Sequence, residues 1–149
     1  MSIISDIKLE LVHIIDPLAK IQDVADYDKQ PAKGFPLVTI TMAANENKFG
    51  SSAQNMRTFL FTITAYEQMQ YNVDNPNASS YNAAVERAEH ILADVVSDIL
   101  NVLDDNITLN NTVEYMEAVP SSWGYMETEA GWFRTAQVDV RVNKYYLVT

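Results

Sequence analysis

The fold class of this chain is decided by the stretch Thr135-Ala136-Gln137-Val138-Asp139-Val140-Arg141-Val142-Asn143. Apolar residues at every second position place one face of an extended strand against a core and leave the other face in water. Such a strand is typical of antiparallel sheets, because the strands of parallel sheets are buried on both faces and read as continuous apolar runs. The sequence therefore predicts an antiparallel sheet that is covered on one side.

Two amphipathic helices are predicted to provide that cover. Apolar residues recur at spacings of three and four near the start of the chain, and Pro17, which has no amide hydrogen, should end this first helix. We expect it over about residues 3–16, and a second stripe with the same spacing predicts a helix over about residues 80–104. Serines that can act as N-caps lie near both starts: Ser2, Ser5, Ser79 and Ser80.

Two β-hairpins complete the predicted fold. The first, over about residues 36–68, joins two alternating strands through a polar stretch at 44–56 that we expect to be a mobile loop or an extended hairpin arm. The second, over about residues 112–146, carries a turn signal at Pro120-Ser121-Ser122 and a second break at Ala130-Gly131. We therefore expect residues 1–149 to form a single α+β domain, with a mainly antiparallel sheet of about four to five strands packed against two helices.

The composition excludes some partners. Twenty acidic and ten basic residues give a formal net charge of −10, which disfavours binding to a phosphate backbone, because that mode depends on clustered lysine and arginine. The negative charge either serves solubility alone or lines a channel along which DNA slides. The candidate acidic surface is Asp98, Asp104 and Asp105, near a predicted helix C-terminus, where negative charge opposes the helix dipole.

The chain offers no sign of a membrane or an export route. No stretch reaches the roughly 20 apolar residues that a membrane helix needs. The first residues lack the basic segment and apolar run of a signal peptide, and there is no cysteine for a disulfide framework. We expect no membrane partner and assembly in the cytoplasm where the protein is made.

No catalytic set can be recognised. Glu86, His90 and Asp94 have the spacing of metal ligands on one helix face, and the same spacing fits a solvated polar face with a Glu–His contact. No second cluster of ligands completes a metal site, and four glycines form no phosphate-binding loop. We expect no enzyme activity, no cofactor and no metal.

Two groups of residues are candidate assembly contacts. Trp123, Tyr125, Trp132 and Phe133 flank the turns of the last hairpin and are either core residues or interface anchors. The polar stretch of the first hairpin supplies the others: Asn45, Glu46, Asn47, Lys48, Phe49 and Asn55.

The order helix, strand, polar arm, strand, helix and terminal hairpin resembles the tail terminator proteins of long-tailed bacteriophages. The stretches that carry the resemblance are residues 34–40, 44–56, 57–63 and 132–142. It implies a structural protein of the virion, at the head-proximal end of the tail, that is assembled in the host cytoplasm and performs no chemistry. It also implies an α+β fold whose sheet edges join between neighbouring subunits.

The partners implied by the resemblance follow from that position. The protein itself would form a homo-oligomeric ring, usually of six subunits, that caps the tail tube and stops its polymerisation. The ring would contact the tail-tube protein on one side and a head-completion or neck protein on the other. DNA would pass through the central channel without specific binding.

Assembly is also expected on physical grounds, since an unpaired outer strand exposes a long edge and no proline interrupts residues 134–142 to blunt the last one. A related interpretation is another head–tail connector or a tail-tube protein of the same particles. From a different class, the aromatic cluster could form the pocket of a small α+β ligand-binding domain. A hydrolase built on scattered carboxylates is the least favoured.

Overall fold

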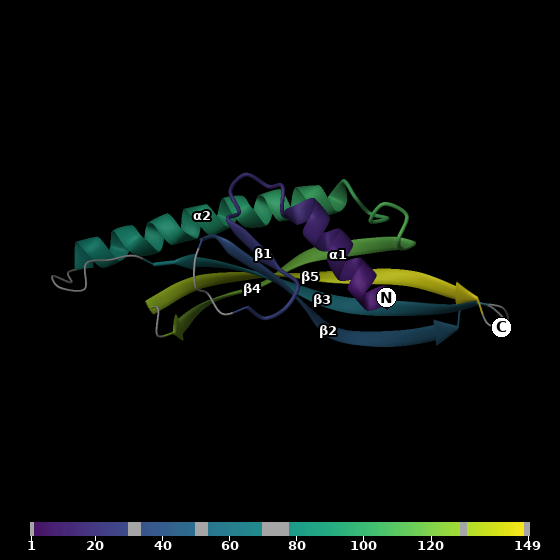
Figure 1. Ribbon diagram of the computed structural model, residues 1–149. Helices are drawn as coiled ribbons and strands as arrows, with labels where there is room; N and C mark the ends of the chain where they lie inside the picture. The colour runs from purple at the N-terminus through teal and green to yellow at the C-terminus, as the bar shows by residue number, and fades with distance from the viewer. Residues whose placement is uncertain (1, 30–33, 50–53, 70–77, 129–130, 148–149) are drawn as a thin grey trace.

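The computed structural model contains two helices and five strands and describes residues 2–29, 34–49, 54–69, 78–128 and 131–147 (Figure 1). In chain order the elements are α1 (Ile3–Ile15), β1 (Asp23–Ala25), β2 (Leu37–Phe49), β3 (Gln54–Gln68), α2 (Ala78–Asp104), β4 (Tyr115–Thr128) and β5 (Gly131–Leu147). The predicted α+β class is confirmed, and both helices lie close to their expected bounds.

All five strands form one sheet in the order β1-β2-β3-β5-β4. β1 runs parallel to β2, and the other neighbouring pairs are antiparallel. β5 pairs with β3 from Gln54↔Leu147 to Gln68↔Phe133 and with β4 along its other side. The expectation that residues 134–142 present an open edge is therefore wrong. Alternation reports which side chains face the core, and it carries no information on what lies beside the backbone.

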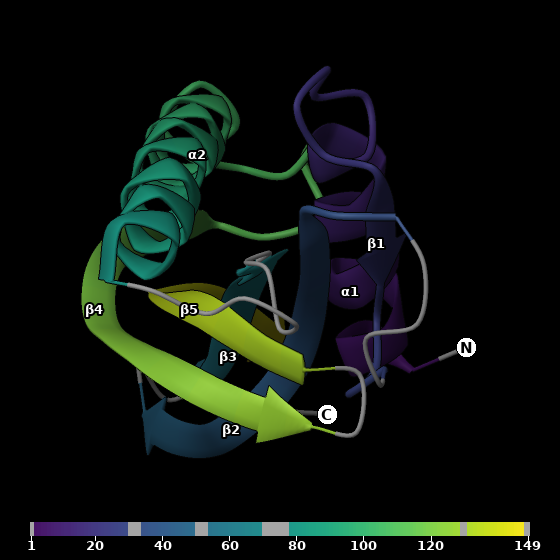
Figure 2. The ribbon, with the colours of Figure 1, turned by 90° about the vertical axis from the view of Figure 1, so that its left-hand side faces the viewer.

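Both helices cover the same face of the sheet (Figures 1 and 2). α2 contacts β3, β4 and β5, and α1 lies against β1, β2 and α2. The alternation of β3 and β5 places one set of side chains in this core, as the sequence predicts. The main buried residues are Ile7, Leu11, Ile15, Val38, Ile40, Phe59, Phe61, Ile63, Leu92, Val95, Ile99, Leu103, Val138, Val140 and Val142. Each such side chain stabilises the fold by about 1.5–3 kcal/mol relative to exposure.

The ends of α1 follow from its sequence. The Ser2 hydroxyl oxygen accepts a hydrogen bond from the amide of Ser5 at 3.1 Å, so Ser2 is the N-cap. The amide of Asp16 donates to the carbonyl of Val12 at 2.8 Å, and Pro17 then ends the helix as predicted.

The start of α2 differs from its prediction. The helix begins at Ala78, so Ser79 and Ser80 lie inside its first turn and do not precede it as N-caps.

The polar stretch of the first hairpin is an extended arm. β2 and β3 stay paired as far as Phe49↔Asn55, with one register shift between Met42 and Ala44. β5 continues on the other side of β3 to Leu147, so the arm is three strands wide along much of its length (Figure 1). Of the two expectations for this stretch, the extended arm is the one that the structure shows.

Pro120-Ser121-Ser122 forms a bulge in a continuous strand, so the predicted turn at this place is wrong. Pro120 pairs with Val138 and Trp123 with Ala136, so two residues of β4 lie opposite one of β5. β4 is the last strand of the sheet, where a proline does not have to donate to a neighbour. A bulge at such a position bends the strand and does not reverse it.

β1 was not predicted. Its three residues pair with residues 37–39 of β2 and give too short a pattern to be recognised in the sequence.

Candidate assembly surface

The aromatic residues of the last hairpin are divided between the core and the surface. Phe133 is fully buried, and its ring centroid lies 5.1 Å from that of Phe35. Trp123, Tyr125 and Trp132 are between 37% and 52% exposed. The cluster therefore contains one core residue and three large aromatic side chains open to a partner.

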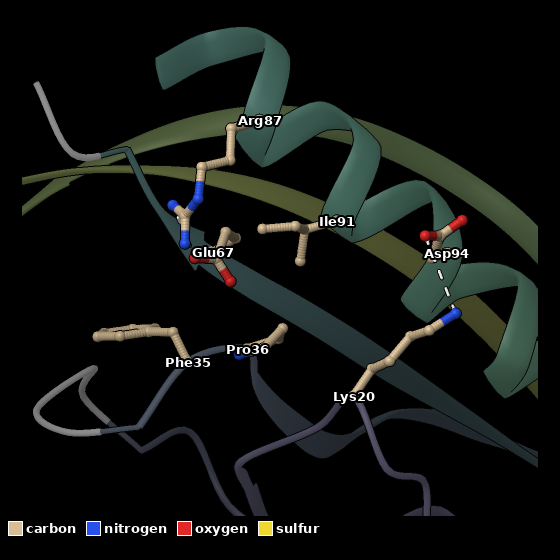
Figure 3. Close-up of a pocket in the computed structure, with 7 residues that line it drawn as sticks. All are labelled: Lys20, Phe35, Pro36, Glu67, Arg87, Ile91 and Asp94. Atoms are coloured by element: carbon tan, nitrogen blue, oxygen red, sulfur yellow. Dashed lines mark ion pairs between the residues drawn. The ribbon is translucent and has the colours of Figure 1, made fainter. Parts of the chain in front are cut away.

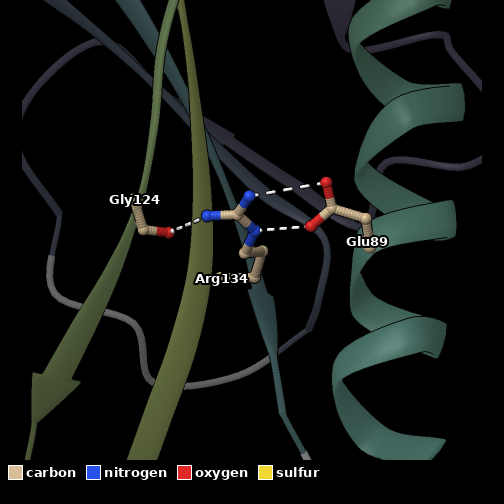
Figure 4. Close-up of polar contacts among 3 residues, drawn as sticks. All are labelled: Glu89, Gly124 and Arg134. Atoms are coloured by element: carbon tan, nitrogen blue, oxygen red, sulfur yellow. Dashed lines mark hydrogen bonds and ion pairs between the residues drawn. The ribbon is translucent and has the colours of Figure 1, made fainter. Parts of the chain in front are cut away.

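Arg134 fixes this aromatic hairpin to helix α2 (Figure 4). Its Nε lies 2.6 Å and its Nη2 3.4 Å from the two carboxylate oxygens of Glu89, which α2 provides. Its Nη1 donates to the carbonyl oxygen of Gly124 at 2.9 Å. The guanidinium carbon lies 5.1 Å from the ring centroid of Trp123 and 4.4 Å from that of Tyr125, within the range of cation–π contacts.

The backbone register explains why these groups meet. Tyr125 lies directly opposite Arg134 in the β4–β5 pair, and Trp123 is the diagonal neighbour on the same face. The Arg134 side chain is only 12% exposed, because the rings cover it from one side and α2 from the other. Its guanidinium therefore holds the two rings in a defined orientation while they remain accessible.

We call Arg134 and the groups that it holds, Glu89, Trp123 and Tyr125, the clamp. A mainly apolar cavity of about 350 Å³ lies next to it. It is lined by Met69 at the end of β3, Tyr81 of α2, and Tyr125 and Trp132 of the hairpin. Exposed aromatic side chains around a concave apolar surface are typical both of interface anchors and of small-molecule pockets.

A second cavity of about 350 Å³ lies on the same side of the sheet, between α2, the end of β3 and the segment that enters β2 (Figure 3). Glu67 forms part of its wall and is 4% exposed, and its Oε2 has no hydrogen-bond partner. Arg87 of α2 is its ion-pair partner at 3.7 Å. Burial raises the pKa of Glu67, and the nearby positive charge of Arg87 opposes that shift.

Sequence reasoning did not single out Glu67 or Arg134, although both leave a signal. Glu67 continues the two-residue period of buried side chains in β3, and Arg134 precedes the buried period of β5. A charged residue at a position that alternation assigns to the core must find a partner there or remain unsatisfied. That mismatch could have identified both residues.

The arm residues proposed as contacts have a described backbone only. The strand pairing places Asn45, Glu46, Asn47, Lys48, Phe49 and Asn55 in the β2–β3 arm. Their side chains lie outside the described part of the structure. The arm is thus placed as a projecting part of the sheet (Figure 1).

The acidic residues of α2 have different surroundings. Asp98 lies 3.6 Å from the ammonium of Lys20, which is also 3.9 Å from Asp94. Asp104 and Asp105 are exposed at the C-terminal end of the helix. Among the three candidates, Asp98 has its charge partly balanced, and the last two contribute most to a negative surface.

Glu86, His90 and Asp94 of α2 have the spacing of metal ligands but do not form a metal-binding cluster. Asp94 lies at the second cavity opposite Lys20, and no group of three His, Asp or Glu side chains suited to a metal ion occurs among the described residues. Neither described helix is long and apolar enough to cross a membrane.

The face of the sheet away from the helices is polar near its centre. A groove of about 500 Å³ there is lined by Asp28, Thr39, Thr41, Thr62, Thr64, Tyr66 and Gln137. Threonine side chains of neighbouring strands provide hydroxyl groups along this face, which a polar neighbour could contact.

Comparison with protein-family models gave no match, and comparison with functionally curated proteins also gave none.

Proposed function

We propose that the protein is a structural virion protein resembling a phage tail terminator, which forms a ring on the end of the tail tube, stops its polymerisation and provides the surface that joins the tail to the head. In this proposal it performs no chemistry and needs no cofactor. It acts at the head-proximal end of the tail and is assembled in the host cytoplasm.

The observation that carries the proposal is the pair of open sheet edges. β1 covers β2 only at residues 37–39, so residues 40–49 have no strand on the outer side among the described elements. At the opposite end of the sheet, no described strand lies beyond β4. A ten-residue edge is about 33 Å long, and a stable monomer normally protects such an edge by pairing, charge, a bulge or proline. The β4 edge has Pro120 and its bulge, whereas residues 40–49 of the β2 edge contain no proline.

Two different edges at opposite ends of one sheet suit a head-to-tail contact. If the β2 edge of one subunit joins the β4 edge of the next, the contact is heterologous, and repeating it closes a ring when the rotation per subunit allows. In this arrangement the arm contacts the tube or a neighbouring subunit, and Asp104 and Asp105 give a negative surface for the channel.

The test of ring formation is the mass of the purified protein by light scattering over a concentration series, with negative-stain images of the heaviest fraction. Six copies of a 16.8 kDa chain have a mass of about 101 kDa, and a ring should show a central hole. A chain that stays at 16.8 kDa at every concentration, and that purified tail tubes do not retain, would overturn the proposal.

A variant of the arm edge tests the mode of joining. Ala43 is exposed and lies in the register shift of β2, so it has no partner residue in β3. Ala43→Pro places a proline in this edge strand and should reduce the ring fraction severalfold, whereas Ala43→Ser keeps the amide hydrogen and should leave the ring fraction unchanged. Circular dichroism must show that both variants remain folded, and Ala43→Lys provides a second test by adding charge to the edge.

One observation favours a second candidate, a small α+β ligand-binding domain. The apolar cavity beside the clamp has the size and lining of a small-molecule site. If this candidate is correct, the monomeric protein should bind anilinonaphthalene sulfonate saturably, and Trp132→Ala should abolish that binding. Ring formation without such binding would favour the terminator proposal.

A further inference from the structure

The cavity at Glu67 contains a buried carboxylate with an unused acceptor. Glu67 Oε2 has no hydrogen-bond partner, and the Arg87 guanidinium lies 3.7 Å from Oε1, beyond hydrogen-bond distance. A carboxylate buried without donors is costly, because its hydration is lost and not replaced. A ligand that donates a hydrogen bond at this point would remove that cost.

The charges around the cavity favour a cation. Among the described residues that line the cavity, Lys20 and Arg87 are basic and Glu67 and Asp94 are acidic. Lys20 is divided between Asp94 and Asp98, and Asp98 lies outside the lining, so part of the charge of Lys20 is directed away from the cavity. The unpartnered oxygen of Glu67 accepts from a cationic donor, whereas an anionic ligand would find no donor on Glu67.

The rest of the wall fits a short apolar stem. Phe35, Pro36 and Ile91 line the cavity beside the charged groups (Figure 3). The volume of about 350 Å³ is at the lower end of the range for ligand sites, so it suits a single side chain. Arg87 and Lys20 are each 54% exposed, which leaves the mouth of the cavity accessible from solvent.

We propose that this cavity receives one arginine or lysine side chain from the surface of a partner protein. The ammonium or guanidinium group donates to Oε2 of Glu67, and the methylene groups lie against Phe35 and Ile91. Arginine is the better occupant, because its planar group can stack on the Phe35 ring while it bonds the carboxylate. The net charge of −10 attracts basic surfaces and so supports a protein partner as the source of the cation. The inference does not depend on ring formation.

The test uses N-acetyl-arginine amide as the probe and N-acetyl-citrulline amide as its neutral counterpart of nearly the same shape. Each is titrated into the ¹⁵N-labelled full chain, and the amide shifts of Glu67, Arg87 and Ile91 are followed. We expect a saturable response to the arginine probe in the millimolar range and about tenfold weaker binding of the citrulline probe. No saturable response, or equal binding of both probes, would overturn the proposal.

Two variants separate binding to Glu67 from a general charge effect. Glu67→Gln should weaken the arginine probe about tenfold, whereas Glu117→Gln, an exposed position on β4 with the same charge change, should have no effect. Arg87→Ala removes the internal cation that competes for Glu67 and should tighten binding severalfold. Weaker binding in Arg87→Ala would contradict the inference, and this variant remains informative if Glu67→Gln does not fold.

Discussion

Replacing Arg134 by lysine should destabilise the protein by about 2 kcal/mol. Lysine keeps the charge and one hydrogen bond to Glu89, but it loses the second contact to that carboxylate, the bond to Gly124 and the planar stacking on the rings. A hydrogen bond to a charged group contributes about 1.5–3 kcal/mol, and an exposed cation–π contact about 0.5–1 kcal/mol. Because Glu89 is 44% exposed, solvent screens the pair and we take the lower end of these ranges.

The assay is urea unfolding followed by tryptophan fluorescence. The only two tryptophans, Trp123 and Trp132, both belong to the β4–β5 hairpin, so the signal reports on the part of the molecule that Arg134 holds. For a chain of this size, a loss of 2 kcal/mol corresponds to a fall in Tm of about 4–8 °C. Arg87→Lys is the matched control, because this arginine is 54% exposed and makes its ion pair at 3.7 Å; it should cost less than about 0.5 kcal/mol.

A double-mutant cycle with Glu89→Gln isolates the ion pair. The changes in unfolding free energy caused by Arg134→Lys and Glu89→Gln should be non-additive by about 1 kcal/mol, since both substitutions weaken the same ion pair. If Arg134→Lys is as stable as the natural chain, or if the two changes are additive, Arg134 does not fasten the hairpin to α2.

Three further changes have predictable effects on stability. Ser2→Ala removes the N-cap of α1 and should lower the free energy of unfolding by about 0.5–2 kcal/mol in urea, whereas Ser5→Ala should have a smaller effect. Thr58→Val leaves the buried Asn143 Oδ1 without the hydroxyl that donates to it at 2.8 Å, so Tm should fall by the equivalent of about 1–3 kcal/mol, and an unchanged Tm would show that another donor replaces it. Glu67→Met should stabilise the protein by about 1 kcal/mol at pH 7, because it removes a poorly paired buried charge. Burial raises the pKa of Glu67, so the natural chain regains this stability when the carboxyl is protonated at lower pH. The difference between the urea midpoints of Glu67→Met and the natural chain should therefore shrink from pH 7 towards pH 4. A difference that stays constant over this range would refute the prediction.

The layers of the fold could be predicted from local pattern, and the order of the strands could not. The alternation at 135–142 correctly assigned the core face of β5, whereas Asn143, which it placed on the wet face, is buried. It did not show that β5 lies between β3 and β4, because each strand needs only one covered face to give that pattern. Pro120 was assigned to a turn because its preference for turns is strong, but an edge strand tolerates proline at a bulge.

The candidate site was predictable only in its exposed part. Trp123, Tyr125 and Trp132 were identified because large aromatic residues near a turn are unusual in a solvated segment. Arg134 and Glu67 depend on contacts with residues of α2 that lie 45 and 20 positions away in the sequence. The packing of the helix on the sheet decides which residues form such pairs. Composition and periodicity do not reveal this packing.

β5 lies inside the sheet, between β3 and the edge strand β4, although it is the last of the five strands to leave the ribosome. Until residues 131–147 emerge, β3 has only one neighbour and β4 has none, while the apolar face of α2 is already synthesised. Contacts between segments so far apart form slowly, and incomplete sheets expose surfaces that aggregate. Nascent chains therefore pass through a stage in which unfinished strands can pair with those of a neighbouring chain, and the cell must keep translating copies apart until each has closed its own sheet.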